Sequence, residues 1–433
     1  MIYVYNFFLY IAAVIASPFM LILLAFNKKW RQSLPERFGF MSRECIDELR
    51  GKKVIWFHAA SAVEVQALAP VIKEFKVMKP DRCLLVTTTS MNGRKKIEKE
   101  LQGVINCAFL LPLDIDFIIK GAMNSVNPEA LVVVETELWP NLLNTARKRK
   151  IPVIMINGRI SIKSFRVYYA FKFFFSWVLN RFDVLIVQSE KMLLRLKRLG
   201  VTKKKIIIMN NTKYSFEIDS KRADEIRNSD KRGRAIVVAG SIREGEEEIV
   251  IKGFVSSGVK NAVLVIAPRH LNRVPVIEKI LGQSGLKYAL WSSFRDYARI
   301  TQYDAVIVNT IGELSYIYTA GDAAIIGGGF MKFGGHNPME AAAAGLPLIM
   351  GKYMFNFEDT ADQFTKNGGA YRAQTAEEIA EKLKLLLTDK ALRLANGEQN
   401  KKIVERFRGS ASTTAMLIDE VLIEFNRETA ANH

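Results

Sequence analysis

The stretch of residues 322–340, DAAIIGGGFMKFGGHNPME, limits most narrowly what this chain can fold into. Residues 323–326 form a short apolar run of the kind that makes a buried strand. Three glycines follow, then the pair Gly334 and Gly335, and then an alanine-rich segment that favours helix after Pro338. The stretch therefore predicts a strand, a glycine loop and a helix N-terminus.

Two interpretations of this loop are open from its spacing. In one, bare backbone N–H groups and the positive end of the helix dipole bind an anion, typically a phosphate. His336 lies in the loop, Asn337 would cap the helix, and Glu340 would reach a ribose hydroxyl. In the other, the glycines make only a tight turn and Glu340 caps the helix, since glycine loops are common.

Length and composition indicate a globular α/β protein of two domains. The chain has 433 residues and 49% hydrophobic residues, enough for two cores. Its three cysteines match no zinc or redox spacing, so we expect reduced thiols. Its four histidines are too scattered for a metal cluster, and we expect neither a metal nor a cofactor.

The net charge of +18 predicts an anionic partner or surface. Residues 141–213 hold 17 lysines and arginines against Asp183 and Glu190. Nucleic acid and anionic lipid are both candidates, and the N-terminus favours lipid. Residues 2–26 form a segment without charged side chains, and this segment is long enough to cross a bilayer as a helix.

Basic residues follow this apolar segment, so we expect a single N-terminal anchor with the remainder of the chain in the cytoplasm. The alternative is a helix that lies in the membrane interface or inside the protein.

Pro35 is predicted to open a short helix that Gly39 closes. Glu36 lies beside Arg37 and has two interpretations. It either forms an ordinary ion pair at the surface or acts as a general base held at the membrane surface.

The first half alternates strands and helices, and several strands end in polar residues. The predicted strands are 54–58, 83–88, 109–113, 131–134, 152–156, 183–188 and 205–209. Ser61 and Glu64 have the spacing of a capping box. Glu135 and Glu137 follow a strand at the edge where doubly wound sheets bind ligands.

Other features of the first half are open to more than one interpretation. Arg159 and Ser161 are candidate phosphate or carboxylate contacts after the strand at 152–156. Asp114 and Asp116 form a D-x-D at a helix start, where acidic residues suit the dipole, so we discount a metal–nucleotide site there. The aromatic, basic segment 165–182 predicts one helix, either packed in the domain or with one face near lipid.

The second half begins after a charged linker near residues 219–234 and repeats the same alternation. Its predicted strands are 235–239, 262–266, 305–308, 323–326 and 346–350, and amphipathic helices follow from about Thr375, the last near 410–427. The predicted fold is therefore two Rossmann-like domains that face a cleft. We assign residues 1–27 to the anchor helix, 28–215 to the first domain and 216–433 to the second, with the last helix a candidate to cross back.

Several motifs in order resemble those of the Kdo (3-deoxy-D-manno-octulosonic acid) transferases of lipopolysaccharide assembly. These enzymes are glycosyltransferases of family 30 with the GT-B fold. The resemblance covers nearly the whole chain, and the number and order of the motifs make it specific. The motifs are PERFG, IWFHAAS, TTTSMNG, LPLD, ETELWPN, INGRIS, EGEE, APRH, IGELSYIY, GGGFMKFGGHNPME and NFED.

The resemblance implies transfer of Kdo from CMP-Kdo to the lipid A precursor, with inversion at the sugar carbon. It implies that Glu36 is the general base, in a protein at the cytoplasmic face of the inner membrane. The implied CMP-Kdo site consists of Arg269, His270, Gly312, Glu313, Leu314, Gly334, Gly335, His336, Asn337 and Glu340. Further candidates, for the acceptor among other contacts, are Arg37, Ser61, Glu64, Glu135, Glu137, Arg159, Ser161 and Lys213.

The sequence departs from the family's patterns at a few positions. Arg243 replaces a histidine in an S-T-H-E-G-E-E pattern, and Asn309 replaces an aspartate in a D-T-M-G-E-L pattern. Lys213 ends a segment that matches a G-N-L-K pattern only in part. Two alternatives to Kdo transfer are a GT-B enzyme that uses another nucleotide sugar on a lipid, and a membrane-anchored nucleic-acid-binding protein. No helix-turn-helix, zinc or RNA-binding motif supports the last.

Overall fold

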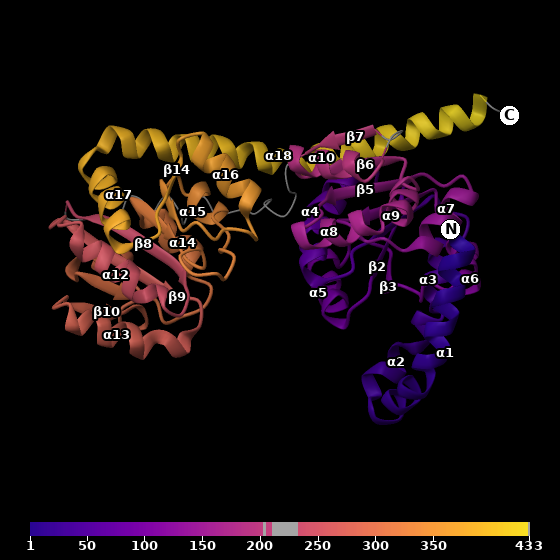
Figure 1. Cartoon of the computed structure of the whole chain (residues 1–433), viewed down its shortest axis with the longest axis horizontal. Helices are drawn as coiled ribbons and strands as arrows, with labels where there is room; N and C mark the ends of the chain where they lie inside the picture. Colours follow the sequence, from indigo (N-terminus) through magenta and orange to yellow (C-terminus); the bar gives the residue numbers. More distant parts are fainter. Residues whose placement is uncertain (202–204, 210–232, 432–433) are drawn as a thin grey trace. The chain divides into compact units, whose positions relative to one another are not determined.

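The computed structural model describes residues 1–201, 205–209 and 233–431, and the chain divides into two compact units. Unit 1 comprises Met1–Ser215 with Phe407–His433, and unit 2 comprises Phe216–Arg406. Each unit contains one seven-stranded sheet whose paired strands are all parallel (Figure 1). The chain therefore has the predicted α/β architecture with two Rossmann-like sheets.

The sheet of unit 1 has the order β3-β2-β1-β4-β5-β6-β7. Its strands are β1 (Val54–His58), β2 (Cys83–Thr88), β3 (Cys107–Leu110), β4 (Ala130–Val134), β5 (Val153–Gly158), β6 (Val184–Val187) and β7 (Lys205–Ile208). Alternate residues of β1 pack into different cores, Trp56 into one and Phe57 into the other. Both faces of the sheet are thus covered, which explains why its strands are nearly continuous apolar runs.

Helices of unit 1 begin with a long apolar segment and continue between the strands. They are α1 (Ile2–Phe26), α2 (Lys28–Arg37), α3 (Arg43–Leu49), α4 (Ala62–Met78), α5 (Met91–Leu101), α6 (Asp116–Val126), α7 (Pro140–Lys148), α8 (Ile162–Ala170), α9 (Lys172–Leu179) and α10 (Glu190–Arg198). Two predictions were wrong. Pro35 lies in the last turns of α2 and does not open a helix, and the segment 165–182 forms two helices that meet at Phe171.

Unit 2 repeats the architecture with the strand order β10-β11-β9-β8-β12-β13-β14. Its strands are β8 (Ala235–Ile242), β9 (Ala262–Pro268), β10 (Tyr288–Leu290), β11 (Ala305–Ile307), β12 (Ala323–Ile326), β13 (Leu348–Met350) and β14 (Ala370–Arg372). Its helices are α12 (Glu246–Ser256), α13 (Val274–Gln283), α14 (Leu314–Ala320), α15 (Met339–Ala343), α16 (Glu358–Lys366) and α17 (Ala376–Thr388). The short strands β10 and β14 were not predicted.

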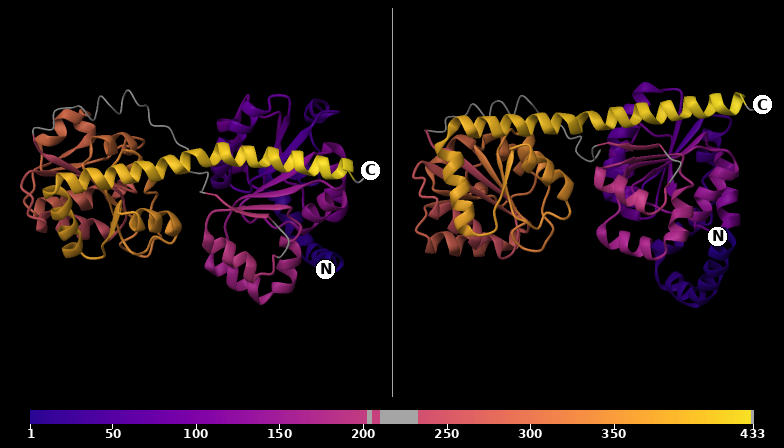
Figure 2. Two further views of the ribbon diagram at one scale, coloured as in Figure 1. Left: turned by 90° about the horizontal axis from the view of Figure 1, so that it is seen from above. Right: turned by 45° about the horizontal axis from the view of Figure 1, so that its top comes forward.

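The last helix, α18 (Lys390–Ala431), is continuous over 42 residues where the sequence predicted separate helices (Figure 2). From Phe407 onward it belongs to unit 1. Ala411, Ala415, Ile418 and Leu422 recur at helical spacing and are buried in the second core of that unit. Packing of this stripe against the first sheet explains why the C-terminal segment is part of unit 1.

The cysteines differ from the sequence expectation. Cys45 in α3 and Cys107 in β3 form a disulfide, with 5.7 Å between their Cα atoms. Cys83 is free and buried. The expectation of three reduced thiols was therefore wrong for two of them, because residues 62 positions apart meet at the edge of the first sheet.

Candidate active site

A pocket in unit 2 lies at the carboxyl ends of three neighbouring strands, β8, β9 and β11. Residues at the ends of these strands and in the segments after them line it: Ser241, Ala267, Pro268, Arg269, His270, Leu271, Asn272, Val308, Thr310, Ile311, Gly312 and Leu314. The set includes four of the residues predicted to bind the donor. Parallel sheets bind ligands at this edge because the loops there converge.

Several amides of the glycine loop after β12, which the sequence predicted as bare, bind a carboxylate of the protein itself. The buried Glu246 carboxylate accepts hydrogen bonds from the N–H groups of Gly328 (2.7 Å), Phe330 (2.9 Å) and Met331 (3.2 Å). It also accepts from the N–H of Arg243 at 3.0 Å. A side chain of the protein therefore binds amides of Gly328 and the residues after the glycines, where the sequence predicted an external anion.

The second glycine pair folds back onto the first loop. Gly335 N–H donates to the carbonyl of Gly328 at 2.7 Å, and His336 N–H donates to that of Gly327 at 3.0 Å. Gly334 has a φ of +99°, a region that a residue with a side chain rarely adopts. The pair is thus needed to bring His336 against the glycine loop.

The pKa of His336 is lowered by burial and by nearby positive charges. Burial, Arg269, Arg243 and His270 together lower the pKa of His336 to about 4. Burial is the largest cause of this lowering, and the neighbouring positive charges add to it. Arg269 and His270, two other residues of the predicted donor site, therefore act electrostatically on His336.

The remaining predicted donor residues have structural partners. Asn337 Oδ1 accepts from the N–H of Met339 at 3.1 Å, but the cap of α15 is Pro338, one residue later than predicted. Burial raises the pKa of Glu340 in the first turn of that helix. Glu313 is the residue before α14.

Both departures from the family's patterns have a place in unit 2. The Arg243 guanidinium lies 4.4 Å from the ring centroid of Phe333, a cation–π contact. Asn309 Nδ2 donates to Ser292 Oγ at 2.8 Å, and its Oδ1 accepts from the N–H of Ser292 at 3.0 Å. Asparagine supplies both a donor and an acceptor to this contact, which aspartate could not do.

In unit 1, Glu36 lies at the carboxyl end of β3. Its Oε2 accepts from the N–H of Leu110 at 2.6 Å and lies 3.3 Å from Arg94 Nη1. The neighbouring Arg37 donates from Nη2 to the carbonyl of Thr89 at 3.0 Å. Arg94 has no distinguishing motif in the sequence, so only the fold reveals it as the partner of Glu36.

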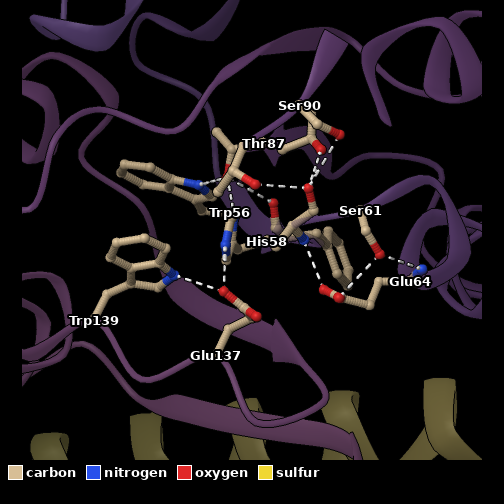
Figure 3. Close-up of polar contacts among 12 residues, drawn as sticks. Trp56, His58, Ser61, Glu64, Thr87, Ser90, Glu137 and Trp139 are labelled. Atoms are coloured by element: carbon tan, nitrogen blue, oxygen red, sulfur yellow. Dashed lines mark hydrogen bonds and ion pairs between the residues drawn. The ribbon is translucent and has the colours of Figure 1, made fainter. Parts of the chain in front are cut away.

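Four predicted candidates, Ser61, Glu64, Glu135 and Glu137, follow β1 and β4 at their carboxyl ends, and Figure 3 shows Ser61, Glu64 and Glu137. Ser61 caps α4, and its Oγ accepts from the N–H of Glu64 at 3.3 Å, as the capping spacing predicted. Glu64 Oε2 in turn accepts from the N–H of Ala60 at 2.7 Å. Glu135 and Glu137 come from the loop after β4, and their charges act on Glu64.

Burial and mutual repulsion perturb the ionisable groups of this crevice. Burial and the charges of Glu137 and Glu135 raise the pKa of Glu64 to about 7. Burial also raises the pKa of Glu137 and lowers that of His58 to about 3. His58 is fully buried at the end of β1, and the sequence analysis did not single it out.

Other candidates have structural roles or fall outside the described residues. Ser161 caps α8, accepting from the N–H of Ser164 at 3.0 Å, and Arg159 follows β5. Asp114 accepts from the N–H groups of Asn141 and Leu142 at the start of α7, which supports discounting the D-x-D. Lys213 lies outside the described residues. Among those described, no three His, Cys, Asp or Glu side chains gather as a metal site would require.

Two Rossmann-like units in one chain, with a pocket at the strand ends of the second, define the GT-B class. Solved structures share this fold. HepE from Anabaena, in complex with UDP, matches 86% of this chain and 100% of its own at a TM-score of 0.57 and 11% identity. The UDP-GlcNAc 2-epimerase from Neisseria meningitidis, bound to UDP-GlcNAc, covers the same shares at a TM-score of 0.57 and 14% identity.

Sequence comparison specifies the family within this class. The model of the 3-deoxy-D-manno-octulosonic-acid transferase (kdotransferase) family matches residues 32–216. A 3-deoxy-D-manno-octulosonic acid transferase from Haemophilus influenzae is 30% identical over 89% of this chain and 90% of its own. The enzyme of that name from Chlamydophila psittaci is 30% identical over 84% of each chain. The chain belongs to the 3-deoxy-D-manno-octulosonic acid transferase family.

Proposed function

We propose that this chain is an inverting glycosyltransferase that moves Kdo from CMP-Kdo to a lipid A precursor in lipopolysaccharide assembly. Family membership supports the transfer of Kdo. The position of Glu36 carries the mechanistic proposal, because this carboxylate lies at the ligand-binding edge of the unit 1 sheet, ten residues after an exposed apolar helix.

In the proposed reaction, the Glu36 carboxylate takes the proton of an acceptor hydroxyl as that oxygen attacks the sugar carbon of the donor. The bond from this carbon to the phosphate oxygen breaks, and CMP leaves with the electron pair. Leu110 N–H and Arg94 hold one oxygen of Glu36 in place. A backbone N–H at the end of β3 therefore fixes the position of the Glu36 carboxylate.

The donor's charges suit the cationic group of unit 2. CMP-Kdo carries one phosphate and one carboxylate, and Arg269, Arg243 and His270 all act on His336 beside the pocket. Charged hydrogen bonds from guanidinium groups stabilise the negative charge that develops on a leaving phosphate. Arg243 adds a permanent charge where the family pattern has histidine, so this chain has one more cation for the donor.

The test is mass spectrometry of a reaction that contains CMP-Kdo, generated in place, and the tetraacylated lipid A precursor. We expect a product heavier by one or more whole Kdo units. Competition by CMP but not UDP would exclude the alternative of another nucleotide sugar. Active binding of CMP with no gain in acceptor mass would contradict the proposed acceptor.

The N-terminal helix supports attachment to a membrane. Among the described residues, α1 alone is long and apolar enough to cross a bilayer, and its window Ile2–Phe19 is not buried. In α8 and α9, Val167, Phe171 and Phe173 are exposed beside basic residues. Exposed apolar side chains with adjacent positive charge suit an anionic headgroup region.

Both ends of the α1–α2 segment are fixed to adjacent residues of unit 1. Tyr5 Oη donates to Asp114 Oδ2 at 3.0 Å, and the N–H of Leu113 donates to the carbonyl of Arg37 at 2.8 Å. A helix that crossed a hydrocarbon core of roughly 30 Å would place its two ends on opposite sides. We therefore propose that the α1–α2 segment enters the inner membrane from the cytoplasmic side and returns to that side, without crossing the bilayer.

Labelling from one side of sealed membranes tests this topology. We expect a membrane-impermeant maleimide to label Tyr3→Cys, at a position 82% exposed, from the same side as the control Lys52→Cys on the surface of unit 1. The native cysteines give little background, since Cys83 is buried and the other two are bonded. Labelling of the two variants from opposite sides would show that α1 spans the bilayer.

A further inference from the structure

The crevice between β1 and β4 is the point where the strand order of unit 1 reverses. Successive strands run from β1 to β2 and β3 in one direction and from β4 to β7 in the other. The loops after β1 and β4 therefore diverge to opposite faces of the sheet at the carboxyl ends of these strands. Open α/β sheets bind ligands at such switch points.

A buried histidine nitrogen points into this crevice without a hydrogen-bond partner. Among the residues that the structure describes, His58 Nε2 is one of thirteen buried side-chain atoms for which no hydrogen bond is formed. It lies 4.0 Å from Glu137 Oε2, which accepts from Trp139 Nε1 at 3.0 Å (Figure 3). A buried polar atom that has no partner in the protein costs free energy unless a ligand or water satisfies it.

The neighbouring hydrogen bonds assign the tautomer of His58. Thr87 Oγ1 accepts from Trp56 Nε1 at 2.9 Å and donates to the carbonyl of Phe57 at 3.3 Å. With this hydroxyl proton directed at Phe57, the imidazole donates in the 3.0 Å contact of Nδ1, in agreement with the hydrogen bond to Thr87 that raises the pKa of His58. The Nε2 atom therefore carries a lone pair, and the crevice presents two acceptors, His58 Nε2 and Glu137 Oε2.

The two acceptor atoms, His58 Nε2 and Glu137 Oε2, indicate which functional groups a ligand must present. Two acceptors require donors, such as the hydroxyl or amide N–H groups of a sugar. Phosphate and carboxylate groups are disfavoured, because Glu64, Glu135 and Glu137 gather at the same strand ends. The imidazole is not a cation that could attract them, since burial holds its pKa at about 3.

The crevice is connected to Glu36 along the same sheet edge. The Thr89 hydroxyl donates to the carbonyl of Ala60 at 2.8 Å, and Arg37 donates to the carbonyl of Thr89. Glu36 contacts the end of β3, two strand spacings from β1, which corresponds to roughly 10 Å. A ligand the size of a disaccharide can therefore reach both places.

We infer that the crevice formed by His58 and Glu137 is the subsite that holds sugar hydroxyl or amide groups of the acceptor while Glu36 acts on the attacking hydroxyl. The inference rests on the proposed function for the identity of the acceptor. It assigns recognition of the sugar ring to His58 and Glu137 and leaves the acceptor's phosphates to basic groups elsewhere. Glu137 is then a specificity-determining residue and not the base.

The test compares Glu137→Gln with wild type for acceptor KM, kcat and binding of CMP. Glutamine keeps an oxygen that accepts from Trp139, and the side chain of Glu137 is 26% exposed, so we expect a folded protein with an unchanged thermal midpoint. That oxygen still accepts a hydrogen bond in the variant but carries no charge, so the bond from the acceptor weakens and we expect the acceptor KM to rise about tenfold. Binding of CMP should not change.

A matched control and a second ligand keep the outcomes separate. Glu74→Gln changes an exposed carboxylate on the same helix as Glu64 and should leave both constants unchanged. Binding of a phosphate-free glucosamine disaccharide, measured without donor, should weaken in Glu137→Gln by the same factor as the acceptor KM rises. An acceptor KM within twofold of wild type, or equal disaccharide binding, would overturn the inference. Absence of transfer by wild type would instead overturn the proposed function, and disaccharide binding would still test the crevice.

Discussion

Glu36→Gln is expected to lower the rate of Kdo transfer by about 10²- to 10⁴-fold, the usual contribution of a general base. Glutamine preserves the shape of the side chain and an oxygen that can accept from the N–H of Leu110. It cannot take a proton from the acceptor hydroxyl. The measurement is the single-turnover rate with saturating donor and acceptor, together with the dissociation constant of CMP.

The control for this experiment uses the same arginine. Glu98 also binds Arg94, with Oε1 at 3.0 Å from Nε, and its side chain is 60% exposed. Glu98→Gln should therefore weaken the ion pair between residue 98 and Arg94 while Arg94 keeps its contact with Glu36. Transfer should stay close to the wild-type rate. If Glu36→Gln weakens CMP binding or unfolds the protein while transfer per folded molecule is retained, Glu36 has a structural role only.

Glu246→Gln is expected to destabilise unit 2 by about 3 kcal/mol or more, because the carboxylate is fully buried and accepts four backbone N–H groups. An amide nitrogen would face some of these donors and leave them unsatisfied. Since the same donors fix the glycine loop and Arg243, CMP should also bind more weakly. Urea denaturation and calorimetric titration with CMP measure the two effects.

Glu248→Gln is the matched control on the same helix. Its side chain is 60% exposed and pairs only with Lys252 in the next turn, so we expect no measurable change in either quantity. Should Glu246→Gln unfold at the same urea concentration as wild type and bind CMP equally, the carboxylate would not be what holds the glycine loop.

The regular parts of the fold were predictable because burial on both faces of a parallel sheet leaves a clear pattern. Strand β1 was predicted at its observed bounds, since all five of its residues are apolar or buried. The strand β12 was likewise predicted, because its apolar run ends at glycines. By contrast, β10 and β14 have three residues each, too few for an alternating or continuous pattern to stand out.

Capping residues could be predicted from local spacing, whereas partners distant in the sequence could not. Ser61 and Glu64 interact within one turn, so their spacing was sufficient. Glu246 binds amides 82 to 85 positions further along the chain, and no local pattern connects it to the glycine loop. Three of the loop's amides were consequently predicted as bare, although a buried carboxylate binds them.

The sequence alone determined the two-unit α/β class, the family and the position of the proposed base, because each depends on local periodicity or on contiguous motifs. Only the tertiary structure decided which side chains meet. It brought Arg94 and Leu110 to Glu36, fixed both ends of α1–α2 to one edge of unit 1, and left the buried His58 Nε2 without a hydrogen-bond partner. These contacts join residues that are tens of positions apart, and their distances follow from the order of strands in the sheet, which no single stretch of sequence encodes.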